Sequence, residues 1–357
     1  MLTGYREEID NIDEQLLSLL TKRKGTAAAL GQVKRDLGVE TFDPAGERAL
    51  LRTLCSKGQG LLTESELKQI FGEIISVGRS VQEALEVGFF GSETNDTHQA
   101  ALDLFGSSAT FHPTPSIEEV FSLVDRHVYQ QGVVPIENAF EGSIGNVLDL
   151  FWKYDLKICA ETLLRIRHHL LTGSDSLEGI RSLYAPPTAA AHCKAWIQNH
   201  LRDIPLEEVE NASIAARRAV EDHGAAAIGS SLAAATYGLK VLEKGIEDHP
   251  DNVMRFVSIG HMDTTPTGRD KTSILFSVQH RPGALFEVLK NLARRKINMS
   301  RIESRPIRVR GWEYLFFVDL EGHAETREVH AALEKMKQAC MSFRHLGSYA
   351  MADSPWP

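Results

Sequence analysis

The sequence has few cysteines and no long apolar run, and both absences restrict the class of protein. The four cysteines are scattered over 357 residues without a Cys-x-x-Cys pair, so we expect reduced thiols rather than a disulfide framework or a zinc site. No stretch approaches the about 20 apolar residues that cross a bilayer. The first residues, MLTGYREEID, carry acidic side chains where a secretory signal would be apolar. We therefore expect a cytoplasmic protein without a metal.

An excess of positive charge is also lacking. The chain has 39 basic and 48 acidic residues and a net charge of -9, whereas general affinity for nucleic acids depends on clustered Lys and Arg. Small-molecule ligands are expected rather than nucleic acid or a membrane. Hydrophobic residues make up 43% and charged residues 24%, the balance of a globular protein. A chain of this length is expected to form two or three domains.

Residues 1–84 predict an all-α domain. Gly38 marks the end of a long first helix, and a helix of this length usually needs a partner, as in a bundle or an intertwined dimer. Asp43, followed by proline, is typical of an N-cap for a second helix. Thr63 and Glu66 form a capping-box pattern that opens a third. The apolar residues that recur with the helical period are Ile9, Ile12, Leu16, Leu19, Leu20, Ala27 and Leu30.

The remaining chain predicts two further domains. Residues 85–262 alternate short apolar runs with amphipathic stretches, which is typical of an α/β domain. A linker at 264–268 leads into residues 270–357, which predict a ferredoxin-like βαββαβ module of the α+β class. The expected strands of this module cover 272–278, 298–303, 313–320 and a segment near Phe343, and its helices cover 284–295 and 326–340.

Two cations of the first helix, Arg23 and Lys34, are predicted to lie on one face. They are eleven positions apart, so they differ by only about 20° around the helix and lie roughly 16 Å apart along its axis. Two long side chains that lean together can bind a small dianion, although a solvated cationic stripe has the same spacing.

The helical segment resembles the all-helical chorismate mutases. The residues that carry the resemblance are Arg6-Glu7, the apolar pattern up to Arg23, Gly31-x-x-Lys34, Asp43-Pro44, Glu47-Arg48, Phe71-x-Glu73-Ile74-Ile75 and Gln82. It implies the rearrangement of chorismate to prephenate, a pericyclic step that needs no nucleophile or cofactor and depends on positioning and charge stabilisation.

By this resemblance, the catalytic residues are Arg6 and Arg23 for carboxylates, Lys34 and Gln82 for the ether oxygen, Glu47 for the hydroxyl, and Asp43 beside them. Arg6 would reach into the site of a partner subunit. Gly46 and Gly78 stand where the family usually has Arg and Ser.

The middle domain resembles prephenate dehydratases, through Val134-Pro135-Ile136-Glu137-Asn138 with Glu141-Gly142-Ser143-Ile144, Thr97-His98-Gln99, and Arg255-Phe256. The resemblance implies two α/β subdomains of the periplasmic-binding-protein type with the substrate between them. It also implies that prephenate loses water and carbon dioxide to give phenylpyruvate. The implied catalytic residues are Thr97, Glu137, Asn138, Arg255 and Phe256.

Several polar lining residues of that family are replaced. Met254 stands where a threonine is central, and a thioether cannot donate a hydrogen bond. Three readings stay open: dehydration with a substituted donor such as Thr97 or Thr188, different chemistry on a related acid, or a non-catalytic domain kept for binding or assembly. The other departures are Thr94, Gly145, Ala185 to Thr188, and Asn211-Ala212.

The last module resembles the ACT domains that bind phenylalanine in these enzymes. The matching residues are Gly283, Ala284 and Leu285, and Glu303, Ser304, Arg305 and Pro306. The first group places a glycine turn at a helix N-terminus, where free N–H groups can receive a carboxylate, although ordinary turns share this pattern. The resemblance implies phenylalanine as an inhibiting effector and a homodimer or larger homo-oligomer.

Overall fold

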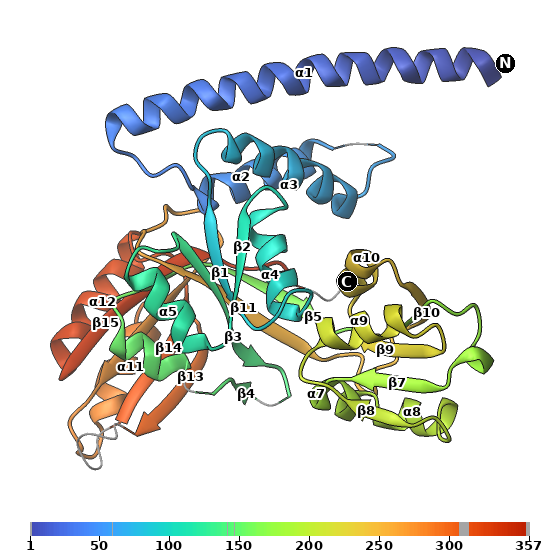
Figure 1. Ribbon diagram of the computed structural model, residues 1–357. Helices are drawn as coiled ribbons and strands as arrows, with labels where there is room; N and C mark the ends of the chain where they lie inside the picture. The colour runs from blue at the N-terminus through green and yellow to red at the C-terminus, as the bar shows by residue number, and fades with distance from the viewer. Residues whose placement is uncertain (1, 59, 141, 146, 307–313, 355–357) are drawn as a thin grey trace.

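The computed structural model describes residues 2–58, 60–140, 142–145, 147–306 and 314–354 (Figure 1). Three helices come first, a two-lobed α/β region follows, and a four-stranded α+β module ends the chain. The predicted fold class is therefore confirmed. No helix formed by the described residues has the length and apolar character needed to cross a bilayer.

Local signals correctly predict the end of the first helix and the starts of the second and third. The first ends just before Gly38, whose φ of 65° favours glycine. The Asp43 side chain accepts a hydrogen bond from the backbone of Gly46, and Thr63 and Glu66 form both bonds of a capping box. These helices are α1 (Leu2–Leu37), α2 (Pro44–Lys57) and α3 (Glu64–Ser80).

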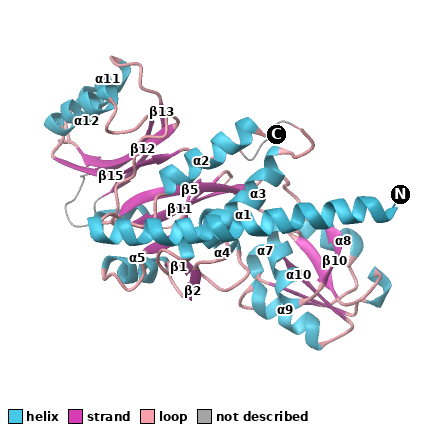
Figure 2. Ribbon diagram, turned by 90° about the horizontal axis from the view of Figure 1, so that it is seen from above, coloured by secondary structure: helices cyan, strands magenta, loops and turns pink. Residues whose placement is uncertain are grey.

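Helix α1 lies across α2 and α3 and extends past them at its N-terminal end (Figures 1 and 2). Gly31 is the one buried residue of this 36-residue helix. Many of its apolar side chains are exposed instead, among them Leu16, Leu19 and Leu20. A helix with an unburied apolar face is stable only when another surface covers that face.

The first lobe of the α/β region is a mixed sheet in the order β2-β1-β3-β11-β5, with β4 paired to β3. Strand β11 returns to this sheet after the whole second lobe and pairs antiparallel with both β3 and β5. The chain therefore crosses between the lobes twice. The elements are β1 (Glu86–Phe90), α4 (Asp96–Phe105), β2 (Thr110–Thr114), α5 (Ile117–Asp125), β3 (Gln131–Asn138), β4 (Gly142–Ser143), α6 (Val147–Lys153), β5 (Lys157–Arg165) and β11 (Val253–Gly260).

The second lobe is a smaller sheet in the order β10-β6-β9-β7-β8. Its strand β9, Ala225–Gly229, is buried along its whole length, as its apolar sequence predicts. The other elements are β6 (His169–Thr172), β7 (Ser182–Ala185), α7 (Pro187–His192), α8 (Lys194–His200), β8 (Leu206–Glu208), α9 (Ala212–Glu221), α10 (Ser231–Tyr237) and β10 (Lys240–Lys244).

The C-terminal module has the predicted βαββαβ order and an antiparallel sheet in the order β13-β14-β12-β15. The expectation that a strand ends at Glu303 is wrong, because β13 continues to Pro306; proline is tolerated there since β13 is the edge strand. Residues 307–313, with the expected strand start at Glu313, lie outside the described residues. The elements are β12 (Asp270–Ser277), α11 (Ala284–Ala293), β13 (Met299–Pro306), β14 (Tyr314–Glu321), α12 (Arg327–Ala339) and β15 (Ser342–Ala350).

One hydrophobic core joins the C-terminal sheet to the first lobe. Phe317 and Tyr349 from this sheet belong to the same buried cluster as Phe121 and Val134. Strand β15 also packs against β5, where Gly347 has a φ of 129° and faces the backbone carbonyl of Ile158. A Cβ on Gly347 would lie far inside van der Waals contact with that carbonyl. The C-terminal module is therefore docked firmly on the first lobe.

The close approach of these strands predicts that Gly347→Ala lowers the thermal unfolding midpoint strongly. Gly268→Ala is the matched control, because Gly268 also has a positive φ of 87° but nothing lies near its Cβ position. Both variants carry backbone strain, and the clash at Ile158 should cost Gly347→Ala roughly 2 kcal/mol more. Equal unfolding midpoints for the two variants would contradict the docking.

Candidate functional sites

The contact of α1 with α3 brings Arg23 and Gln82 together. Arg23 Nη1 donates a hydrogen bond to the carbonyl of Ile74 at 2.9 Å. A Cβ at Gly78 would lie 2.9 Å from that same nitrogen, so the glycine leaves room for the guanidinium. Gln82 Nε2 donates to the Gly78 carbonyl at 3.1 Å, while its Oε1 is buried without a hydrogen bond among the described residues.

The start of α2 adds Asp43 and Glu47 near Lys34. Lys34 Nζ donates to the carbonyl of Thr41 at 2.9 Å, and Glu47 interacts electrostatically with Asp43 and Lys34. Burial raises the pKa of the Glu47 carboxyl, although Arg79 opposes that shift. The Asp43 cap occupies the space where a side chain at position 46 would begin, which suits Gly46. Arg23 and Gln82 thus lie at the contact of α1 with α3, and Lys34, eleven positions along α1 from Arg23, lies near Glu47 at the start of α2.

Arg79 makes contacts that the sequence did not indicate. Its Nη1 lies 2.6 Å from Glu47 Oε2, and its Nη2 donates to the carbonyl of Phe105 at the end of α4. The guanidinium lies over the ring of Phe42 at 5.2 Å. Arg79 therefore connects the helical domain with the first lobe. A cation in the last turn of α3 is ordinary helix chemistry, so no sequence signal marked it.

Arg6 does not meet the other cations within one chain. It lies seventeen positions from Arg23 on the same helix, a separation of about 26 Å along the axis. The predicted role of Arg6 thus requires a second copy of the chain.

The second candidate site is a cavity between the two lobes. The Asn138 side chain accepts a hydrogen bond from the Phe140 backbone at 2.9 Å. Met254 is the register partner of Asn138 on the neighbouring strand and packs against the apolar cluster under α4. The residues that line the cavity are Asn138, Phe140, Ile166, His192, Glu247, His249 and Asn252.

The loop before α4 closes against the second lobe. Thr94 has a φ of 65°, a left-handed conformation that disfavours a β-branched residue. Its Oγ1 lies 3.3 Å from Ser213 Oγ, and its carbonyl accepts a hydrogen bond from Ser230 at 2.9 Å. The strained backbone of Thr94 therefore occurs at a point where the two lobes are bonded to each other. Thr97 follows on α4 with a buried side chain, whereas Thr188 is exposed at the start of α7.

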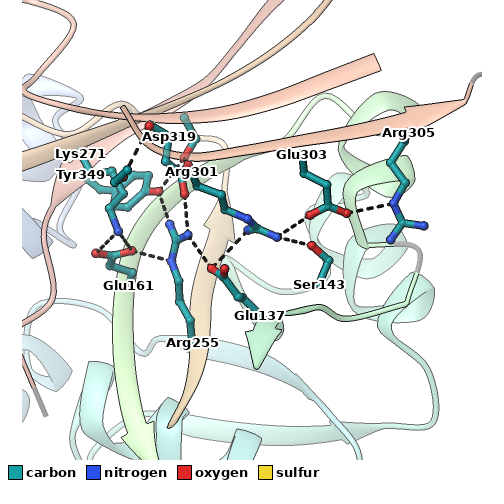
Figure 3. Close-up of polar contacts among 12 residues, drawn as sticks. Glu137, Ser143, Glu161, Arg255, Lys271, Arg301, Glu303, Arg305, Asp319 and Tyr349 are labelled. Atoms are coloured by element: carbon teal, nitrogen blue, oxygen red, sulfur yellow. Dashed lines mark hydrogen bonds and ion pairs between the residues drawn. The ribbon is translucent and has the colours of Figure 1, made fainter. Parts of the chain in front are cut away.

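Arg255 lies in a buried ion-pair network between β11 and the C-terminal sheet (Figure 3). It contacts Glu161 at 2.7 Å, Asp319 at 2.5 Å and the Tyr349 hydroxyl at 2.8 Å. Its distance to Glu137 is longer, 3.5 Å. Phe256, the next residue, is fully buried in the core of the first lobe.

The partners of Arg255 were missed by the sequence interpretation. Glu161 follows the buried run Ile158 to Ala160, and Asp319 lies between the buried Val318 and Leu320; a charge in such a position signals a buried pair. Burial by itself raises the pKa of Glu161, but Arg255 and Lys271 outweigh burial and hold this pKa at about 2.

The two predicted effector motifs face different surroundings. Gly283 caps α11 with a φ of 79°, and Ala284 and Leu285 line a cavity with Tyr314 and Phe316. On β13, side chains alternate in direction: Arg301, Glu303 and Arg305 are half-buried, and Ile302, Ser304 and Pro306 are exposed. Among the described residues, no cluster of His, Cys, Asp or Glu is arranged to hold a metal ion.

Comparison with known families defines the class of each region. Residues 5–83 match "Chorismate mutase type II", residues 87–264 match "Prephenate dehydratase", and residues 272–338 match "ACT domain". A bifunctional chorismate mutase/prephenate dehydratase of Aquifex aeolicus is 39% identical over 355 residues, covering 98% of both chains. The chain belongs to the family of bifunctional chorismate mutase/prephenate dehydratases.

Solved structures agree with this fold. A prephenate dehydratase of Arthrobacter aurescens in complex with L-Phe matches with a TM-score of 0.67 and 32% identity, covering 75% of this chain and 90% of the other. A protein described as a quorum-quenching acylase, GqqA, has the same TM-score at 25% identity, covering 76% of this chain and 99% of the other. The fold by itself therefore does not fix one chemistry.

The lowered pKa predicts how Glu161 contributes to stability. The carboxylate stabilises the folded chain fully above the ordinary pKa of 4.5, and this stability is lost as the pH falls towards 2. Glu161→Gln should lower the free energy of unfolding at pH 7 by on the order of 3 kcal/mol. Its thermal unfolding midpoint should fall accordingly. Its midpoint should then fall less than that of the parent between pH 4.5 and pH 2. The exposed Glu243→Gln serves as the control, and parallel profiles for all three proteins would refute the network.

Proposed function

We propose that this chain converts chorismate to prephenate and prephenate to phenylpyruvate, and that phenylalanine inhibits it. The observation that carries the proposal is the uninterrupted order of the three family matches, shared along the full length of relatives named for both activities. Prephenate made by the helical domain is the substrate of the α/β region, so one chain performs two consecutive steps.

In the helical domain, Arg23 binds a carboxylate of chorismate and selects the reactive conformer. Lys34 Nζ and the second N–H of Gln82 Nε2 donate to the ether oxygen, where negative charge develops as its C–O bond breaks. Glu47, fixed by Arg79, accepts a hydrogen bond from the substrate hydroxyl. The step is a rearrangement within one molecule, so these residues act by position and charge alone.

Between the lobes, Asn138 and Glu137 orient prephenate. Its ring carboxylate leaves as carbon dioxide, the electrons of the broken C–C bond make the ring aromatic, and the ring hydroxyl leaves with a proton as water. That proton needs a donor, which Met254 cannot supply. Thr97, buried at the start of α4, is the proposed substitute, since Thr188 is exposed.

A second candidate function keeps the mutase but makes the α/β region a divergent or non-catalytic binding domain. The replacement of polar lining residues, above all by Met254, is the observation that favours it. The full-length relatives named as bifunctional enzymes do not favour it.

We also infer a homodimer or larger homo-oligomer. The exposed apolar residues of α1, such as Leu16 and Leu19, need a covering surface, and Arg6 is too far from Arg23 to share its site within one chain. The α1 helix of a second copy of the chain supplies both the covering surface and the Arg6 that joins each Arg23. A cytoplasmic location accords with the four free cysteines.

The first test supplies chorismate and measures chorismate loss and phenylpyruvate formation separately, with and without phenylalanine. We expect both chorismate loss and phenylpyruvate formation, and phenylalanine should lower the rate of phenylpyruvate formation. Chorismate loss with accumulation of prephenate would refute the dehydratase. No chorismate loss would refute the mutase, and the dehydratase is then assayed with prephenate supplied directly. If phenylalanine neither binds nor changes a rate, the effector assignment is wrong.

Restoring a hydroxyl at position 254 tests the missing donor. Met254→Thr should raise the rate of phenylpyruvate formation from prephenate at least about ten-fold, because one aligned donor is worth that much. The chorismate mutase rate should stay the same. Met341→Thr, at an exposed position, is the matched control. An unchanged or lower rate in Met254→Thr would show that position 254 is not where a donor is missing and would leave Thr97 as the donor.

The shared mutase site can be tested by mixing two inactive variants. Arg6→Ala and Arg23→Ala should each lose most mutase activity, whereas the exposed Lys24→Ala should keep it. When the two inactive variants are refolded together in equal amounts, half of the dimers are mixed and each has one intact site. The mixture should therefore recover about a quarter of the parent activity. No recovery in verified mixed dimers would show that Arg6 does not act across the interface.

A further inference from the structure

Glu137 of the dehydratase motif lies between two arginines that come from opposite sides of the interface (Figure 3). Its Oε2 is 3.5 Å from Arg255 Nη1 on β11 and 3.6 Å from Arg301 Nη1 on β13. Both distances exceed that of a charge-assisted hydrogen bond, which is about 2.7 to 2.9 Å. The carboxylate is therefore attracted by two charges but tightly bonded to neither.

Arg255 cannot move towards Glu137 without breaking stronger bonds. Its guanidinium already donates to Glu161, Asp319 and Tyr349 at 2.5 to 2.8 Å. The side chain is only 6% exposed. Arg255 is thus a fixed neighbour of Glu137.

Arg301 has one guanidinium nitrogen that can donate a further hydrogen bond. Its Nη2 donates to Glu303 at 2.8 Å and to the hydroxyl of Ser143 on β4. Its Nη1, the nitrogen nearest Glu137, is buried and makes no hydrogen bond among the described residues. The guanidinium lies over the ring of Phe317 at 5.0 Å. A movement of about 0.7 Å would bring Nη1 within hydrogen-bonding distance of Glu137.

Glu303 links the same guanidinium to the effector segment. It holds Arg301 with one oxygen and Arg305, at 3.2 Å, with the other. Arg305 in turn donates to the carbonyl of Gly145, just beyond β4. Ser304 and Pro306, between and after these residues, point to the exposed side of the edge strand. A ligand that displaces β13 therefore moves Arg301 relative to Glu137 and Ser143.

We propose that Arg301 is a positioning residue for Glu137 and that phenylalanine inhibits the dehydratase by drawing Arg301 away from Glu137 and Ser143. The inference rests on the proposed dehydratase activity and its inhibition. Without effector, the charges of Arg301 and Arg255 both attract the Glu137 carboxylate. With effector, Glu303 keeps Arg301, and Glu137 loses one of its two cations.

The test compares Arg301→Gln, Arg301→Lys and Ser143→Ala with the parent chain. The exposed Arg327→Gln on α12 is the matched control. Arg301→Gln should lower kcat for phenylpyruvate formation about ten-fold, because a misplaced orienting group costs roughly one to two powers of ten in rate, and phenylalanine should lower it no further. Calorimetry should still detect phenylalanine binding, and the mutase rate should be unchanged. Arg301→Lys should recover part of the response, and Ser143→Ala should weaken it in the same direction. Arg327→Gln should match the parent.

Parent-like kcat, KM and inhibition in Arg301→Gln would overturn the inference and leave the proposed function intact. If Arg301→Gln also loses its mutase rate and unfolds, Arg301→Lys and Ser143→Ala decide, and parent-like behaviour of both overturns the inference. Loss of phenylalanine binding in Arg301→Gln would make Arg301 part of the effector site and also contradict a positioning role. A parent chain that forms no phenylpyruvate removes the proposed function and the inference with it.

Discussion

The Arg255 guanidinium stays protonated and positively charged, and it is buried where the first lobe meets the C-terminal sheet. A buried charge of this kind is tolerated only when partners surround it. Glu161 comes from β5, and Asp319 and Tyr349 come from two strands of the C-terminal module. The network therefore requires these two parts of the chain to lie side by side. The helical domain meets the same place, because Arg48 on α2 donates to the carbonyls of Glu161, Ala350 and Met351.

This arrangement places the C-terminal module against the strands that carry the dehydratase motif. Strand β11 carries Arg255 towards the C-terminal sheet and Met254 beside Asn138, so adjacent residues serve the interface and the site. Strand β3 is equally shared, because Glu137 faces Arg255 and Arg301. A regulatory signal thus needs no long path through the molecule. It needs two discrete arrangements of one guanidinium, which is the physical requirement for coupling between sites.

The features that sequence predicted are those that depend on neighbours along the chain. The Asp43 and Thr63 caps, the end of α1 at Gly38 and the βαββαβ order were all correct for that reason. Arg23, Lys34, Glu47 and Gln82 were chosen by resemblance; the structure places Arg23 and Gln82 at the contact of α1 with α3, and Lys34 near Glu47 at the start of α2. The partners of Arg79 and Arg255 could not be predicted, because residues far apart in sequence form them. The extension of β13 to Pro306 also depended on pairing with β14, which local sequence does not reveal.

The central claim is that the C-terminal module acts on the dehydratase site through β3, β4 and Arg301. Hydrogen–deuterium exchange with and without phenylalanine tests it most directly, because it reports local opening of each strand. Phenylalanine should change protection in peptides covering residues 131–143 and 299–306, and leave α9 (Ala212–Glu221) in the second lobe unchanged. A change confined to residues 270–354, with residues 131–143 unaffected, would contradict the account.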